Sequence, residues 1–245
     1  MNVSVSPLAL PFALVRPFLN AASAAGRAWV WKTSFVGAAF VAVETRSAGF
    51  CEGTASPWDF RTFSVLRTDS LDGDGLDVQQ VLGEDALGAF FESAEAFLDA
   101  LPEDRQVRYI PQPDPANWSL VHRRGAWKLV GRLESAERAR AADVVDFDVD
   151  FDVPPRLTGP QKSIPWTRVS TAARDARDVF VSPSGALVAI QRPLLLTVHP
   201  VVKGRIQAAV LGHPLPQGVA IVSVQWLDAA ATQRVRAALR GEGRR

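Results

Sequence analysis

The chain has 245 residues, of which 47% are hydrophobic and 22% charged, and its formal net charge is +1. This composition is ordinary for a soluble globular protein with a real core. It excludes a disulfide framework, because Cys51 is the only cysteine. It also excludes a membrane-spanning helix, because the longest apolar run, residues 34–43, is shorter than the about 20 residues that a bilayer requires. We therefore expect a cytoplasmic protein without a membrane partner.

The charges are distributed unevenly along the chain. Residues 1–102 carry a net charge of −6, residues 103–152 carry −2 and residues 153–245 carry +9. A basic C-terminal third is typical of an anion-binding surface. Arginines make up 23 of the 27 basic residues, which suits nucleic acid because the guanidinium fork binds phosphate with two hydrogen bonds. A GC-rich genome gives the same bias.

The N-terminal third mixes strand and helix patterns. Residues 3–15 are apolar and β-prone, are interrupted by prolines and lack the basic start of a signal peptide. Phe18, Ala22, Ala25 and Trp29 recur at helical spacing after a proline. In order, we expect an edge strand at 3–15, a helix at 17–31, a buried strand or a continuation of this helix at 35–43, a loop at 47–60 and a strand at 61–67.

An acidic turn and a clear helix follow. In residues 69–77, Asp72 and Asp74 resemble the start of a calcium-binding loop. Leu76 takes the next ligand position, however, so a solvated turn is the better interpretation. Residues 84–101 carry an apolar stripe with a 3.6-residue period, which predicts an amphipathic helix packed on a core.

The second half is predicted to consist mostly of short strands joined by turns. Residues 111–115 form a proline-rich linker, and Arg124-Gly125 is a plausible hairpin turn. In order, we expect strands at 107–110, 118–122 and 126–133, a charged helix at 134–142, a strand at 146–153, an irregular basic segment at 157–170, strands at 179–181, 186–191 and 194–198, a glycine- and proline-rich loop at 203–218, a strand at 219–226 and a closing helix at 228–239.

These elements predict an α+β fold, with mainly antiparallel sheets and a few packed helices. Two ferredoxin-like halves fit the element count. The proline-rich stretch would separate an acidic half, residues 1–110, from a basic, β-rich half, residues 116–245, although one compact domain also fits. A glycine-rich loop late in paired ferredoxin-like halves resembles the architecture of RNA-processing proteins of the CRISPR-associated repeat type. This resemblance implies a subunit of a ribonucleoprotein.

Residues 146–153 alternate aspartate with phenylalanine or valine, so that four carboxylates share one face of a strand. Asp148 and Asp150 are the candidates for a metal site that would orient phosphates. Repulsion among four like charges, and the lack of a nearby histidine or glutamate, argue against metal. The favoured interpretations are an ionic partner of the preceding basic hairpin and a solvated, edge-protecting face. A docking face for a basic partner protein is a further alternative.

The hairpin interleaves aromatic and basic residues, a pattern that holds single-stranded nucleic acid by stacking and phosphate contacts. Alternation places Trp127 on one face with Leu129, so we expect the tryptophans in the core and the bases outside. His122, beside two arginines, is a weak candidate for an acid or base in RNA cleavage. His199 lies in an apolar strand and is expected to be structural.

The sequence therefore favours a protein that binds nucleic acid, with RNA or single-stranded nucleic acid as the partner and RNA slightly favoured over DNA, and that needs no cofactor. The expected binding residues are Arg123, Arg124, Lys128, Arg132, Lys203, Arg205, Arg234, Arg236 and Arg240. Backbone amides of the glycine-rich loop are a further source of phosphate contacts. One alternative is a metal-dependent or RNA-cleaving enzyme centred on Asp148, Asp150 or His122. Another is a non-catalytic structural subunit of a protein complex.

Overall fold

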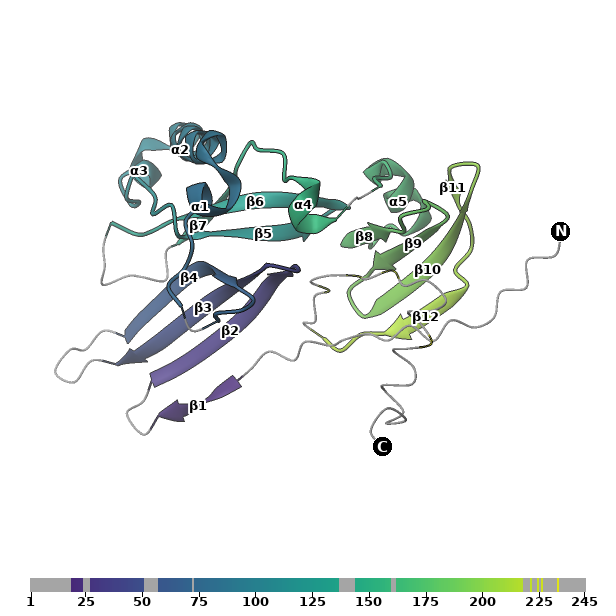
Figure 1. Ribbon diagram of the computed structural model, residues 1–245, viewed down its shortest axis with the longest axis horizontal. Coiled ribbons are helices and arrows are strands. Elements are labelled where there is room, and N and C mark those ends of the chain that lie inside the picture. The colour runs from purple at the N-terminus through teal and green to yellow at the C-terminus, as the bar shows by residue number, and fades with distance from the viewer. Residues whose placement is uncertain are drawn as a thin grey trace. The chain divides into compact units, whose positions relative to one another are not determined.

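Antiparallel sheets and a few helices make up the computed structural model of this protein, which therefore has an α+β fold (Figure 1). The structure describes residues 19–23, 27–50, 57–71, 73–136, 144–159 and 162–217, and the single positions 221, 224, 226 and 233. Its strands form three sheets, within residues 19–67, 118–148 and 178–214. In the described part of the chain, no helix is long and apolar enough to cross a membrane.

The first sheet is a meander of four antiparallel strands. They are β1 (Leu19–Ser23), β2 (Arg27–Val36), β3 (Phe40–Phe50) and β4 (Pro57–Arg67). The helix predicted at 17–31 is wrong, because β2 pairs with β3 over most of its length. The loop predicted at 47–60 is wrong where β3 and β4 pair within it, and the strand predicted at 61–67 is confirmed.

Three helices follow: α1 (Val78–Leu82), α2 (Glu84–Asp99) and α3 (Glu103–Gln106). The end of the acidic turn starts α1, since the Asp77 carboxylate accepts a hydrogen bond from Gln80 N at 2.7 Å and the Gln80 side chain accepts one from Asp77 N at 2.9 Å. This reciprocal pair is a capping box, which satisfies two backbone donors that a helix start leaves open. The helix predicted at 84–101 is confirmed, with Phe90 and Ala94 buried.

The second sheet carries the predicted hairpin. Its strands are β5 (Trp118–Arg123), β6 (Ala126–Leu133) and β7 (Val145–Asp148), in that order. Arg124 (φ 52°) and Gly125 (φ 85°) are both left-handed, as the favoured two-residue hairpin turn requires. The hairpin is thus confirmed, whereas the aspartate strand predicted at 146–153 ends as a strand at Asp148. The strand predicted at 107–110 is reduced to one bridge between Tyr109 and Ser135.

One hydrophobic core joins residues from both sides of the proline-rich stretch. Phe35 and Val65 from the first sheet share a cluster with Phe90, Trp118 and Phe147. Two hydrogen bonds also join residues before and after this stretch. Trp118 Nε1 donates to the Leu76 carbonyl at 2.8 Å, and Phe63 N donates to Asn117 Oδ1 at 2.8 Å. Trp118 is fully buried and Trp127 partly buried against this core, so the expectation that the tryptophans are core residues is confirmed.

The third sheet contains β8 (Asp178–Val181), β9 (Leu187–Gln191) and β10 (Leu195–Val202), with β11 (Arg205–Ile206) and β12 (Leu211–Pro214) both paired to β10. Two short helices precede it, α4 (Pro155–Thr158) and α5 (Trp166–Ala172). Val169 of α5 packs with Val179, Val188 and Ile190 in a second core. The strands predicted at 179–181, 186–191 and 194–198 are confirmed, whereas the loop predicted at 203–218 contains β11 and β12.

The ferredoxin-like halves are not confirmed, since the strands of the first sheet follow one another in order and no helix separates them in its described residues. Several predicted elements lie wholly or mostly outside the described residues: the strand at 3–15, the helix at 134–142, the strand at 219–226 and the helix at 228–239.

Candidate anion-binding groove

The first two aspartates of the alternating stretch are ionic partners of the hairpin. Asp146 lies directly opposite Arg132 on β6 and accepts from its Nε at 2.7 Å. Asp148 accepts from Arg123 Nη1 at 2.9 Å. The ion-pair interpretation is thus confirmed for these two residues. Asp150 is exposed and its backbone N donates to Ser93 Oγ at 3.0 Å. Within the described residues, no group of three or more His, Cys, Asp or Glu side chains is placed to hold a metal ion.

Arg132 is an internal cation. It is 3% exposed, and its Nη2 donates to Glu44 Oε1 at 2.8 Å while its Nε donates to Asp146. Its guanidinium carbon lies 3.8 Å from the centre of the Phe63 ring, which adds a cation–π contact. A phosphate outside the protein does not reach a guanidinium enclosed in this way. Arg132 is therefore removed from the residues available to nucleic acid.

The other hairpin cations remain at the surface. Lys128 and Arg124 are exposed, and the Arg123–Asp148 pair is exposed on both sides. Exposed ion pairs of this kind contribute little stability, so Arg123 exchanges its partner readily for another anion. Arg124 occupies the first position of the hairpin turn, and its guanidinium carbon lies 5.8 Å from the centre of the Trp166 ring on α5.

His122 is held inside a contact between the hairpin and β8. Its Nδ1 lies 2.7 Å from the Asp178 carboxylate, and its ring stacks on Phe180 with 4.5 Å between ring centres. Trp127 meets it edge-on at 4.9 Å. Both side chains of the His122–Asp178 pair are less than a tenth exposed. This arrangement supports a structural role, and the same holds for His199, whose two ring nitrogens lie 2.8 Å from the Gln207 carbonyl and 2.9 Å from Thr197 Oγ1.

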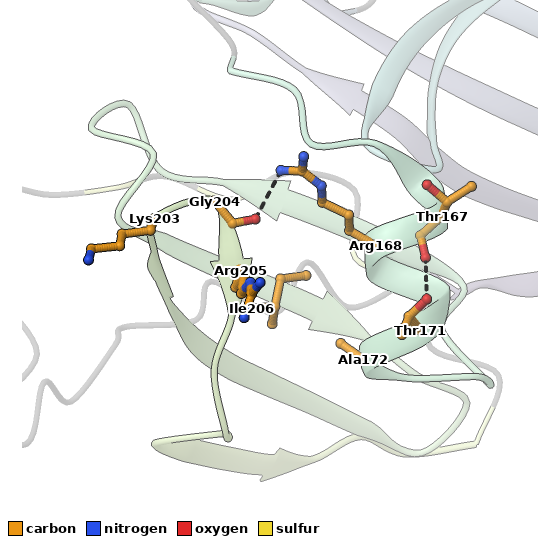
Figure 2. A pocket seen from close by; sticks show the side chains of 8 residues that line it. All are labelled: Thr167, Arg168, Thr171, Ala172, Lys203, Gly204, Arg205 and Ile206. Carbon is orange, nitrogen blue, oxygen red and sulfur yellow. Dashed lines mark hydrogen bonds between the residues drawn. The ribbon is translucent and has the colours of Figure 1, made fainter.

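A groove opens between α5 and the turn that joins β10 to β11 (Figure 2). Its volume is about 620 Å³, and its lining residues are Thr167, Arg168, Thr171, Ala172, Lys203, Gly204, Arg205 and Ile206. Lys203 (φ 49°) and Gly204 (φ 72°) form the two-residue turn, in which the left-handed backbone favours glycine. Arg168 Nη1 donates to the Gly204 carbonyl at 2.9 Å and so ties the helix to the turn.

Three further side chains, two cations and a threonine, give the groove its charge and a polar wall. Figure 2 shows Lys203 extending away from α5 at the outer rim, whereas Arg205 lies at β11. Thr171 Oγ1 donates to the Thr167 carbonyl at 2.7 Å, within the helix. The groove thus combines three cations with threonine hydroxyls and an exposed backbone turn, which are the groups that bind oxyanions.

The two carboxylates of residues 153–217 are already occupied. Asp175 accepts from Arg192 Nε at 2.7 Å, and this hydrogen bond, with a smaller coulombic contribution, holds the pKa of the Asp175 carboxyl below its usual value. Asp178 binds His122. Within the described ranges, no carboxylate lies at ion-pair distance from Arg168, Lys203 or Arg205. These three cations are therefore available to an external anion.

The structure brings together only some of the residues that the sequence singles out. Lys203 and Arg205 meet at the groove, and the hairpin supplies Arg124 beside α5. Arg234, Arg236 and Arg240 lie outside the described residues. Arg168 is the groove residue that the sequence analysis missed, because residues 157–170 were expected to be irregular.

Comparison with known proteins gives no relative for this chain: no protein-family model, curated protein or solved structure matches it.

Proposed function

We propose that this protein binds nucleic acid, with RNA slightly favoured over DNA, and that the groove between α5 and the β10–β11 turn contacts the phosphate backbone. The observation that carries the proposal is the grouping of Arg168, Lys203 and Arg205 around one groove, with no carboxylate partner among the residues described. A guanidinium without a carboxylate partner keeps most of its donors for an external oxyanion, and the arginine fork matches phosphate geometry.

The charge of the surrounding sequence supports the same proposal. Residues 153–217 contain eight Lys and Arg but only two acidic residues, Asp175 and Asp178. Asp175 is bound to Arg192 and Asp178 to His122, so neither acid competes for the groove cations. A segment with this excess of positive charge attracts polyanions over distances of about a Debye length.

The experiment is a salt titration of binding. A labelled single-stranded RNA of mixed sequence, about 15 nucleotides long, is titrated with the protein at several salt concentrations. We expect the affinity to fall steeply as salt rises, because each phosphate contact releases counterions. Replacing Arg168, Lys203 and Arg205 together by Gln should weaken binding at every salt concentration and lower the slope of log affinity against log salt by about one for each lost contact.

Arg108→Gln is the matched control. Arg108 is also exposed, and its Nε donates to the Asp104 carbonyl at 3.2 Å, far along the chain from the groove. This variant should bind RNA as the native protein does. An affinity too weak to measure at about 50 mM salt would contradict the proposal, and so would equal losses in Arg108→Gln and in the triple variant. Comparing RNA with DNA of the same sequence tests the slight preference for RNA.

The enzyme alternatives have less support from the contacts. Asp148 is paired with Arg123, and His122 is enclosed against Asp178 and Phe180. A role as a ribonucleoprotein subunit is tested by purifying the protein from its own cells, measuring the ratio of absorbance at 260 and 280 nm and identifying what co-purifies. Protein without nucleic acid in a defined complex would favour the structural-subunit alternative instead.

A further inference from the structure

The tip of the β5–β6 hairpin makes a cation–π contact with the first residue of α5. Arg124 is exposed and its guanidinium carbon lies 5.8 Å from the centre of the Trp166 ring. Trp166 is partly buried and packs against the second core, the cluster around Val169 and Val179. One part of the indole is therefore fixed by the protein interior, while the guanidinium lies over its ring at the surface.

Two contacts from the hairpin to one carboxylate of β8 hold the hairpin tip in this position. Asp178 accepts from Gly125 N at 2.8 Å and from Val179 N at 2.8 Å, and it contacts His122 Nδ1 at 2.7 Å. The turn also fits closely, because a Cβ on Gly125 would lie 2.8 Å from Val179 Cγ1. Arg124 thus projects from a turn whose backbone is fixed on β8, so that no backbone ordering is needed when its side chain meets a ligand.

The indole of this cation–π pair directly precedes two groove residues in the sequence of α5. Trp166 is followed by Thr167 and Arg168, which line the groove. One short helix therefore carries both a groove cation, Arg168, and the indole that Arg124 covers. Planar guanidinium groups and aromatic rings are the surfaces on which proteins stack unpaired bases. In a duplex the same base faces are covered by their neighbours in the helix.

We infer that Arg124 and Trp166 form a stacking platform for an unpaired base, so that the ligand of the groove is single-stranded nucleic acid and duplex is discriminated against. This inference rests on the proposed function and adds to it the form of the ligand and the residues that select it. The groove cations supply an attraction that is independent of the bases, and the platform supplies the preference for exposed bases. His122 and Asp178 are positioning residues for this platform.

The test separates the two contributions with three ligands of equal length: a single strand, an abasic strand with the same number of phosphates, and a duplex. At one salt concentration, the native protein should bind the single strand about 5- to 100-fold more tightly than the abasic strand, the range expected for one stacked base, and more tightly than the duplex. Arg124→Lys keeps the charge but loses the planar stacking surface. It should remove most of this preference while leaving the affinity for the abasic strand unchanged.

Two further variants make the result decisive. Trp166→Leu removes the other half of the platform and should have the same effect as Arg124→Lys, whose exposed site avoids any folding defect. Arg108→Lys changes an exposed arginine outside both the groove and the platform and should keep the native preference. Equal affinity for the three ligands, or a native preference in Arg124→Lys, would overturn the inference while salt-dependent binding through Arg168 still stands. Failure of every ligand to bind at about 50 mM salt would overturn both this inference and the proposed function.

Discussion

Arg132 and Asp146 face each other across β6 and β7 and form an ion pair of 2.7 Å whose guanidinium is almost fully enclosed. Glu44 on β3 shares the same guanidinium at 2.8 Å. A single buried cation therefore links two different sheets through two carboxylates. Exposed Lys32 adds a weaker contact to Glu44 at 3.7 Å.

Breaking this link should be costly. Arg132→Ala leaves Glu44 and Asp146 without their shared cation, and we expect the free energy of unfolding to fall by roughly 2–4 kcal/mol, somewhat less than for a fully buried pair because both carboxylates are partly exposed. Arg123→Ala breaks an exposed pair and should cost about 1 kcal/mol or less. Urea denaturation of the two variants measures the difference, and equal losses would contradict the structural assignment of Arg132.

Two glycines give opposite predictions for the same substitution. A Cβ on Gly131 of β6 would lie 2.3 Å from Phe147 Cζ and 2.5 Å from Phe90 Cε2, so Gly131→Ala overpacks the core and should cost about 1–3 kcal/mol. A Cβ on Gly88 of α2 has nothing within 4 Å. Gly88→Ala should raise stability by about 0.5–1 kcal/mol through helix propensity. Thermal unfolding tests both, and a stabilising Gly131→Ala would show that these aromatic rings are packed differently.

Removal of the Asp178 carboxylate should loosen the hairpin tip. Asp178→Ala leaves the Gly125 and Val179 amides and the His122 ring without their acceptor, and buried groups of this kind cost about 1–3 kcal/mol each. We expect a total loss of about 3 kcal/mol or more, together with faster amide exchange at Gly125. Asp175→Ala is the matched control. Its pair with Arg192 is exposed, so its effect on stability should be within about 1 kcal/mol.

The Asp175 carboxyl should titrate at lower pH than a free aspartate, since its hydrogen bond from Arg192 lowers its pKa. Because the folded pKa lies below the unfolded one, this pair contributes stability above the unfolded pKa and loses it as the pH falls through the folded pKa. In Arg192→Gln, the pKa of Asp175 should rise toward its usual value. Carboxyl chemical shifts followed by NMR through the acid range measure it, and an unchanged pKa would contradict the contact.

Magnesium should not stabilise the protein through the aspartate stretch. Asp148 is engaged by Arg123, and Asp150 is exposed without a described ligand set around it. Melting curves with EDTA and with magnesium should therefore coincide. A stabilising shift that disappears when Asp148 and Asp150 are both changed to Asn would restore the metal hypothesis.

The elements that the sequence predicted well are those whose signals are local. The apolar period of α2 and the turn chemistry of Arg124-Gly125 each lie within a few residues, and both predictions are confirmed. The helix expected at 17–31 is wrong because residues of this segment pair with β3. A local pattern of apolar residues gives no information on such a distant partner. Strand propensity depends on such neighbours more than helix propensity does.

The candidate groove could not be predicted from the sequence for a related reason. Arg168 and Gly204 are 36 residues apart and meet only through the packing of α5 near the β10–β11 turn. The alternation of residues 146–153 correctly predicted a basic partner for Asp146, but it carried no information on burial. The enclosure of Arg132 depends on Glu44 and Phe63, which belong to a different sheet.

The shared core also dictates how the molecule can be divided for further study. A fragment starting at residue 116 would lose the Leu76 acceptor of Trp118 Nε1 and the apolar partners Phe35 and Val65, so its hairpin would lack the support that presents Arg124. A fragment starting near residue 162 keeps Arg168, Lys203 and Arg205 but leaves out Arg124 altogether. Any shortened version designed for crystallisation with an oligonucleotide should therefore retain the chain from β1 onward.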